Sequence, residues 1–239
     1  MNNNAVLENY ELRANARAQL KGVWGTAVLA FFILFLIDLP FNVTTVIDSL
    51  YTFNEQFSMG LDIPDVSGIN TLFMIIFIVI GGPFALGFAG FFLKRIRGED
   101  FSVNNIFDGF NRFLPAFLLM IFSSIFVFLW AMLLIIPGIV KMYGYSMAFY
   151  ILNDNPGMNP LEALKKSEAM MNGYKKKLFL LQLSFFGWAF LCAFAWIGFL
   201  WLQPYVQLSI ANFYENLKKS SAESQPLIQN ETKELEQAL

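Results

Sequence analysis

Four long apolar stretches constrain this chain more than any other feature of its sequence. A helix needs about 20 consecutive apolar residues to cross the roughly 30 Å of hydrocarbon in a bilayer. Residues 22–41 and 71–93 each have this length, and between them they carry a single charged side chain. Residues 113–152 and 178–214 are similarly apolar but too long for one crossing, so each stretch predicts two shorter antiparallel helices.

The predicted fold class is therefore all-α: a polytopic membrane helical bundle with six transmembrane helices as three hairpins, together with interfacial amphipathic helices. The spans are predicted near residues 22–41, 71–93, 113–135, 138–153, 178–198 and 202–217. Because proline lacks an N–H group and glycine tolerates unusual dihedral angles, the second hairpin should turn at 136–138 and the third between 196 and 204. Residues 1–217 form a single membrane domain in this prediction, and the polar residues 218–239 form a cytoplasmic tail.

The distribution of lysine and arginine predicts the orientation in the membrane. Of the 16 basic residues, three precede the first span, four lie between 94 and 112, five lie between 154 and 177, and three follow residue 217. Only Lys141 lies elsewhere, and the connection 42–70 carries acidic residues but no basic ones. Because basic loops are retained in the cytoplasm, both termini should be cytoplasmic.

The composition excludes many familiar activities. The chain has no histidine and a single cysteine, Cys192, which lies in an apolar run. This rules out histidine acid–base catalysis, histidine metal ligands and an intrachain disulfide. A net charge of -2 offers no basic field for nucleic acid. We therefore expect no catalytic, cofactor or metal site and no nucleic-acid partner, so the chain should not be an enzyme.

The connector 159–173 carries the signals of a complete amphipathic helix. Asn159 suits the N-cap, Pro160 suits the first helical position, and Gly173 suits the C-terminal end. Its apolar side predicts either packing on the bundle or docking on lipid or a protein partner at the cytoplasmic interface.

Four lysines are the candidate lipid or interface residues, namely Lys141, Lys175, Lys176 and Lys177. The last three follow the connector helix, and a basic cluster in this place is typical of anionic-lipid binding or of a topology signal. Lys141 follows the predicted turn of the second hairpin, where its long stem allows the ammonium group to reach the outer headgroups. The other interpretation of Lys141 is a residue on a transport path.

Prolines and glycines within the spans predict helix breaks. The candidates are Gly81, Gly82, Pro83, Pro137, Gly138 and Pro204. A break near the middle of the span 71–93 is typical of transporter helices, although small residues there also favour close helix packing.

Short motifs spread over nearly the whole chain carry a resemblance to a known family. They are Leu20-Lys21-Gly22-x-Trp24, Ile136-Pro137-Gly138, Asn153-Asp154-Asn155-Pro156, Glu162-Ala163-Leu164, Met171-Asn172-Gly173 and Gly198-x-x-Trp201-x-x-Pro204-Tyr205. The chain resembles the domain-of-unknown-function family 975, a group of uncharacterised bacterial integral membrane proteins. The Ile-Pro-Gly turn is also similar to the membrane-anchor region of certain glycerophosphodiester phosphodiesterases. The resemblance implies a multi-pass bacterial membrane protein and supplies no catalytic residues.

We therefore expect a non-enzymatic multi-pass protein of the bacterial cytoplasmic membrane that interacts with lipid or acts as a scaffold in the cell envelope. Its expected partners are membrane lipids and either another protein or a second copy of the chain. The alternative is a small transporter or lipid-moving protein with a polar path near Lys141.

Overall fold

The computed structural model describes residues 6–194 and 198–237, and these residues form helices and connections without strands. The elements are α1 (Asn9–Leu20), α2 (Trp24–Phe57), α3 (Ser67–Arg97), η2 (Val103–Arg112), α4 (Phe113–Leu133), α5 (Ile135–Tyr145), α6 (Ala148–Asp154), α7 (Pro160–Met170), α8 (Lys175–Leu183), α9 (Phe186–Phe194) and α10 (Phe199–Gln237). η2 is a 3₁₀ helix and the others are α-helices. The predicted all-α class is confirmed for this part of the chain.

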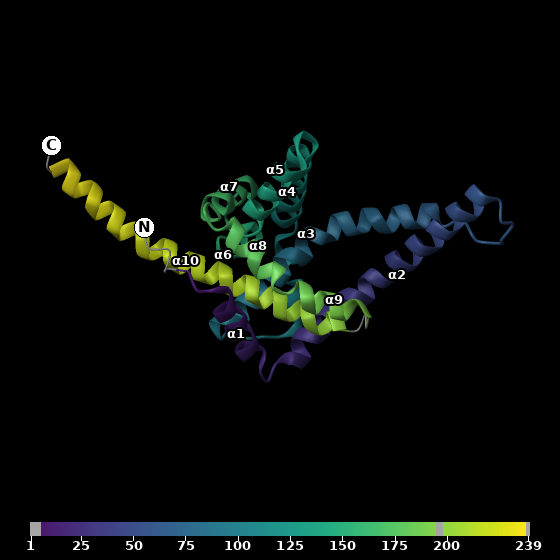
Figure 1. Ribbon diagram of the computed structural model, residues 1–239, viewed down its shortest axis with the longest axis horizontal. Helices are drawn as coiled ribbons and strands as arrows, with labels where there is room; N and C mark the ends of the chain where they lie inside the picture. Colours follow the sequence, from purple (N-terminus) through teal and green to yellow (C-terminus); the bar gives the residue numbers. More distant parts are fainter. Residues whose placement is uncertain (1–5, 195–197, 238–239) are drawn as a thin grey trace.

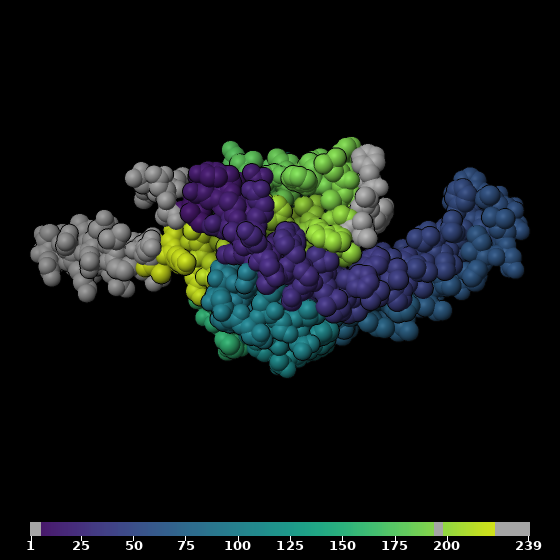
Figure 2. Space-filling view, turned by 90° about the horizontal axis from the view of Figure 1, so that it is seen from below, coloured from purple at the N-terminus to yellow at the C-terminus, as the bar shows by residue number. Residues whose placement is uncertain are grey.

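The molecule has a compact body and a long two-helix arm (Figure 1). The arm consists of α2 and α3, which contain 34 and 31 residues. At 1.5 Å per residue, each helix is about 50 Å long. The arm leaves the body on the side opposite to the C-terminal end of α10, and Figure 2 shows it from a second direction.

The hydrophobic core lies in the body, where the C-terminal half of α3 packs against η2, α6 and α10. Phe91, Ile106 and Phe213 are completely buried there. The packing of α3 on η2 requires glycine, because a methyl group added at Gly87 would overlap the backbone carbonyl of Ile106. The apolar middle of α2 is not part of this core, since only 11% of its most apolar 18-residue stretch is buried within the protein.

Five helical stretches among the described residues are long and apolar enough to cross a membrane. They are Trp24–Phe57, Ser67–Arg97, Val103–Leu133, Ile135–Asp154 and Lys175–Ala193. These stretches bear out a membrane protein with several spans by length and composition. The sixth predicted span, 202–217, lies in α10 and is not among them, so it stays a prediction.

The apolar helices form pairs, but the first two pairs are not parallel. α2 packs against α3, α4 packs against α5, and α9 packs against α10. The tip of the α4–α5 pair points away from the body in a different direction from the α2–α3 arm (Figure 1). The predicted bundle of six transmembrane helices as three hairpins is therefore not confirmed. The predicted turn of the third hairpin overlaps residues 195–197, which lie outside the described residues.

The predicted helix breaks at residues 81–83 and at Pro204 need correction, because α3 and α10 continue through them. Pro137 and Gly138 lie in the first turn of α5, just after the break that the structure shows. Proline removes one hydrogen bond from a helix interior, and packing by neighbouring helices can hold the helix together despite that loss. At Gly82 the packing is especially close, because an added methyl group would meet the backbone of α4.

The actual break in the second hairpin is one residue long. Leu134 has extended dihedral angles (φ -157°, ψ 137°) between the last residue of α4 and the first of α5. The predicted tail also begins inside a helix, since α10 runs through residue 217 and continues to residue 237.

Candidate functional site

The connector helix forms where the sequence predicts it, as α7. The side chain of Asn159 accepts a hydrogen bond from the Leu161 N–H (2.9 Å), and Pro160 is the first helical residue. Proline suits this position because its missing N–H would have no partner there. Ala163 and Leu164 are buried in the contacts of α7 with α4, α5 and α6. The apolar side of α7 therefore packs on the body, which was one of the two predicted interpretations.

A buried serine fixes α7 to the junction between α5 and α6. The hydroxyl of Ser167 donates to the carbonyl oxygen of Gly144 (2.7 Å) and accepts from the Met147 N–H (3.1 Å). Ser167 is completely buried. Because α5 ends at this junction, the serine satisfies backbone groups that the helix no longer pairs.

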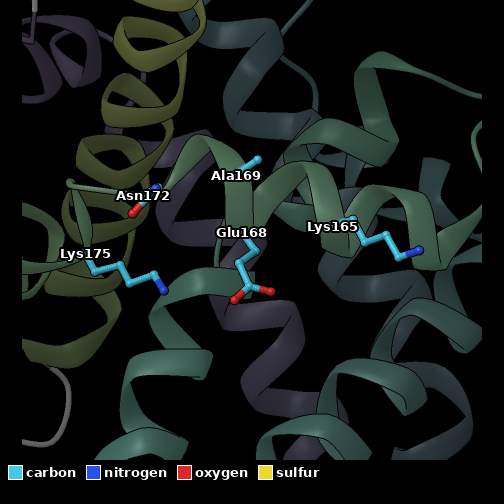
Figure 3. Close-up of a pocket in the computed structure, with 5 residues that line it drawn as sticks. All are labelled: Lys165, Glu168, Ala169, Asn172 and Lys175. Atoms are coloured by element: carbon cyan, nitrogen blue, oxygen red, sulfur yellow. The ribbon is translucent and has the colours of Figure 1, made fainter.

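An open depression of about 370 Å³ lies on the other side of α7, against the start of α8. It is lined by Lys165, Glu168, Ala169, Asn172 and Lys175. Figure 3 shows Glu168 between the two lysines. Neither Lys165 nor Lys175 forms a hydrogen bond or ion pair with another described residue, so both ammonium groups are available to a ligand.

Lys141 lies beside this depression and forms an ion pair with Glu168. Its Nζ atom also lies 5.1 Å from the ring centroid of Trp130 and 5.9 Å from that of Tyr145. A cation at this distance over an aromatic ring is attracted by the negative face of the ring. The side chain of Lys141, which belongs to α5, is thus held against α7, and α7 lies in the connector that carries the exposed lysines. Glu168 is a residue of this site that the sequence reasoning missed, because no local pattern links it to a lysine 27 positions earlier.

The structure separates the three consecutive lysines. Lys175 lines the depression, and Lys176 is exposed. Lys177 instead donates to the carbonyl oxygen of Val6 (2.8 Å) and lies 3.4 Å from the carboxylate of Glu8. It therefore attaches α8 to the segment before α1, and the predicted cluster is not one continuous binding surface.

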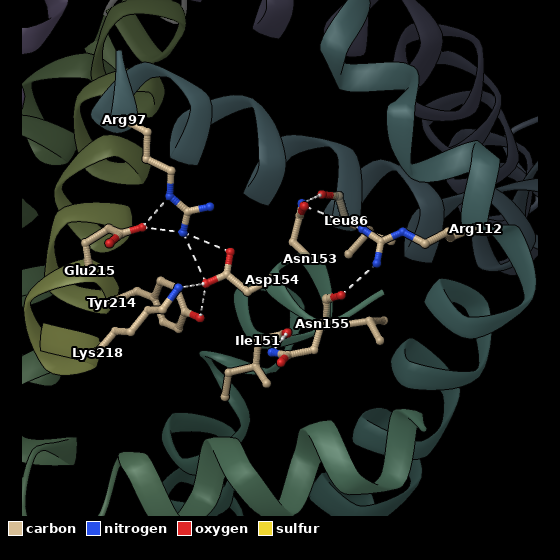
Figure 4. A network of polar contacts seen from close by, with 11 residues as sticks. Leu86, Arg97, Arg112, Ile151, Asn153, Asp154, Asn155, Tyr214, Glu215 and Lys218 are labelled. Carbon is tan, nitrogen blue, oxygen red and sulfur yellow. Dashed lines mark hydrogen bonds and ion pairs between the residues drawn. The ribbon is translucent and has the colours of Figure 1, made fainter. Parts of the chain in front are cut away.

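A second polar group joins the C-terminal ends of α3 and α6 to the middle of α10 (Figure 4). The carboxylate of Asp154 accepts hydrogen bonds from Tyr214 (2.8 Å) and Lys218 (2.5 Å) and pairs with Arg97 (2.8 Å). Arg97 also pairs with Glu215. The Asp154 side chain is only 7% exposed, so its charge is neutralised inside the protein and the group is suited to holding helices together. The sequence pattern predicts Arg97 and Lys218 only as topology charges.

A family model matches residues 6–143 and 132–221, and it describes the family as "Protein of unknown function (DUF975)". The chain belongs to this family. No curated protein and no solved structure matches this DUF975 protein. The predicted membership is therefore confirmed, while the similarity to glycerophosphodiester phosphodiesterases has no support among the matches.

Among the described residues, no group of three or more acidic, histidine or cysteine side chains is placed to hold a metal ion. Cys192 is a free thiol in α9. The residue types that do converge are lysines around one carboxylate, and ammonium groups in such a depression can bind a negatively charged oxygen group.

Proposed function

We propose that this DUF975 protein is a non-enzymatic membrane protein that binds the phosphate of anionic lipid headgroups in the depression between α7 and α8. The observation that carries the proposal is the pair of unpartnered lysines, Lys165 and Lys175, on either side of Glu168. A lysine near an anionic membrane surface contributes about 1 kcal/mol of attraction.

The site lies in the connector that the positive-inside rule assigns to the cytoplasm, which supports binding at the cytoplasmic leaflet. α7 places Lys165 on an exposed surface, and the site is open to a headgroup that approaches from outside the protein. The same rule supports a bacterial cytoplasmic membrane location with both termini inside the cell. The transporter alternative has less support, because Lys141 pairs with Glu168 beside an open surface depression.

Two matched double variants test this proposal. Lys165→Gln with Lys175→Gln removes the two lysines that line the depression, and Lys166→Gln with Lys176→Gln removes two exposed neighbours on the same helices. Both variants change the net charge by the same amount. Binding of phosphatidylglycerol against phosphatidylcholine is compared by native mass spectrometry of each protein in neutral detergent.

We expect the first variant to lose at least ten times more bound phosphatidylglycerol than the control variant. The reason is that Lys165 and Lys175 would each donate a charge-assisted hydrogen bond to the phosphate, worth about 1.5–3 kcal/mol, whereas the control lysines would not, and a difference of this size is more than tenfold in affinity. Equal lipid retention in the two variants would contradict the proposal and leave the lysines as topology signals.

A further inference from the structure

The tip of the α4–α5 hairpin is an exposed apolar surface. Its five consecutive residues have exposed fractions of 67–74%, and they are Met132, Leu133, Leu134, Ile135 and Ile136. No polar side chain occurs from residue 131 to residue 140. A turn that emerges into water normally carries polar residues, whereas an exposed apolar patch of this kind marks a surface that another apolar phase covers.

The position of α7 fixes the depth that this tip can reach. α7 carries the exposed side chains of Glu162, Lys165 and Lys166, so it lies at the level of water and headgroups and not in hydrocarbon. The ion pair between Lys141 and Glu168 holds α5 beside α7. The contact of Lys141 with Trp130 places α4 at the same level.

Only a short piece of hairpin extends beyond this level. Lys141 comes seven positions after Leu134 at the tip, and a helix rises 1.5 Å per residue, so the tip lies about 10 Å beyond the charged pair. The hydrocarbon layer is about 30 Å thick, and a helix that crosses it needs about 20 residues. A hairpin that extends 10 Å beyond charged groups ends inside the nearer leaflet.

We propose that the α4–α5 hairpin is a re-entrant element that enters and leaves the membrane on the side of α7, with its tip in the acyl chains of that leaflet. Length and composition alone admit both helices as spans, because they take no account of the contact with α7. The proposal goes beyond headgroup binding, since it concerns how this part of the chain is inserted and does not depend on the lysine site.

The backbone of the turn suits a place in hydrocarbon, where unpaired polar groups are costly. Leu134 is the one residue outside the two helices, and its N–H donates to the carbonyl oxygen of Trp130 (3.0 Å) while its carbonyl accepts from Gly138 (3.3 Å). Pro137 has no N–H group that would need a partner. These two hydrogen bonds satisfy both backbone groups of the one residue that lies outside the helices.

Cysteine labelling in intact cells distinguishes a re-entrant hairpin from a crossing one. Single cysteines are placed in a Cys192→Ala background as Ile135→Cys at the tip, Ser58→Cys at the end of α2, and Lys166→Cys on α7. Ile135 is highly exposed, so its replacement removes little packing. A membrane-impermeant maleimide is applied before and after permeabilisation, and labelling in SDS confirms that each thiol is present.

We expect Ser58→Cys to be labelled from outside, Lys166→Cys only after permeabilisation, and Ile135→Cys in neither condition. Labelling of Ile135→Cys from outside would show a crossing hairpin, and labelling only after permeabilisation would show a tip in cytoplasmic water. Either result overturns the proposal. A failure of Ser58→Cys to react from outside would instead contradict the predicted overall orientation.

A depth measurement provides an independent readout in proteoliposomes. A bimane fluorophore on Ile135→Cys should be quenched at least twofold more by lipids with a spin label on the acyl chain than by lipids with the label on the headgroup. Stronger quenching by the headgroup label would also overturn the proposal.

Discussion

Replacing Ser167 with alanine should loosen the attachment of α7 and lower the stability of the whole body. The hydroxyl is completely buried and forms two hydrogen bonds, with Gly144 and Met147. Alanine removes both and leaves the Met147 N–H in a buried place without its partner. A lost hydrogen bond is worth about 1 kcal/mol, and a buried unpaired donor costs about 1–3 kcal/mol. We therefore expect the free energy of unfolding to fall by about 2–3 kcal/mol.

The matched control is Ser184→Ala, at the junction of α8 and α9. Its hydroxyl donates only to the carbonyl oxygen of Leu181, which lies three residues earlier in α8 (2.6 Å). Removing it leaves no buried N–H without a partner, and such changes usually stay within about 0.5 kcal/mol. Unfolding in detergent is followed by far-UV circular dichroism while SDS is added. The SDS concentrations at the midpoint of unfolding are compared for the unsubstituted protein, Ser167→Ala and Ser184→Ala.

The reasoning fails if Ser167→Ala unfolds at the same midpoint as Ser184→Ala. That result would mean that α7 is held by its apolar contacts alone, or that the Met147 N–H finds another acceptor. A specific effect should also reach the candidate site, because α7 carries three of the residues that line the depression, Lys165, Glu168 and Ala169. Headgroup binding should therefore weaken in Ser167→Ala and stay unchanged in Ser184→Ala.

Two further pairs of substitutions test the packing and the charges of the body. Gly87→Ala should prevent close packing of α3 on η2, because the new methyl group would overlap the carbonyl of Ile106; we expect a loss of at least about 2 kcal/mol in the same SDS titration. Gly25→Ala meets no atom within 4 Å, so it should be neutral or stabilise α2 by up to about 1 kcal/mol. Asp154→Asn should destabilise by about 2–3 kcal/mol, because it removes the counter-charge of Lys218 and leaves Arg97 with Glu215 alone, whereas Asp108→Asn, whose side chain is 51% exposed, should cost less than about 1 kcal/mol. Equal losses in Asp154→Asn and Asp108→Asn would show that burial of the ion pair is unimportant.

The all-α class and the start of α7 come from local sequence signals, and both are confirmed for the described residues; α7 ends at Met170, before the predicted Gly173. A run of about 20 apolar residues is a property of the sequence alone, and so is an asparagine followed by a proline at the start of a helix. The orientation with both termini in the cytoplasm also rests on the sequence, through the distribution of basic residues, and stays a prediction.

The candidate site depends on contacts that no local pattern contains. Lys141 meets Glu168 only because α5 and α7 pack together, and the three consecutive lysines separate only because α1 approaches the start of α8. The helix through Pro83 persists for a similar reason, since close packing at Gly82 and Gly87 outweighs the local tendency of proline to interrupt it. Sequence spacing determines which side chains share a face of one helix, whereas the energies of packing and pairing between helices decide which faces meet. For this protein, the sequence by itself determined where apolar helices form, and the tertiary structure alone decided which charged groups lie together and where the second hairpin breaks.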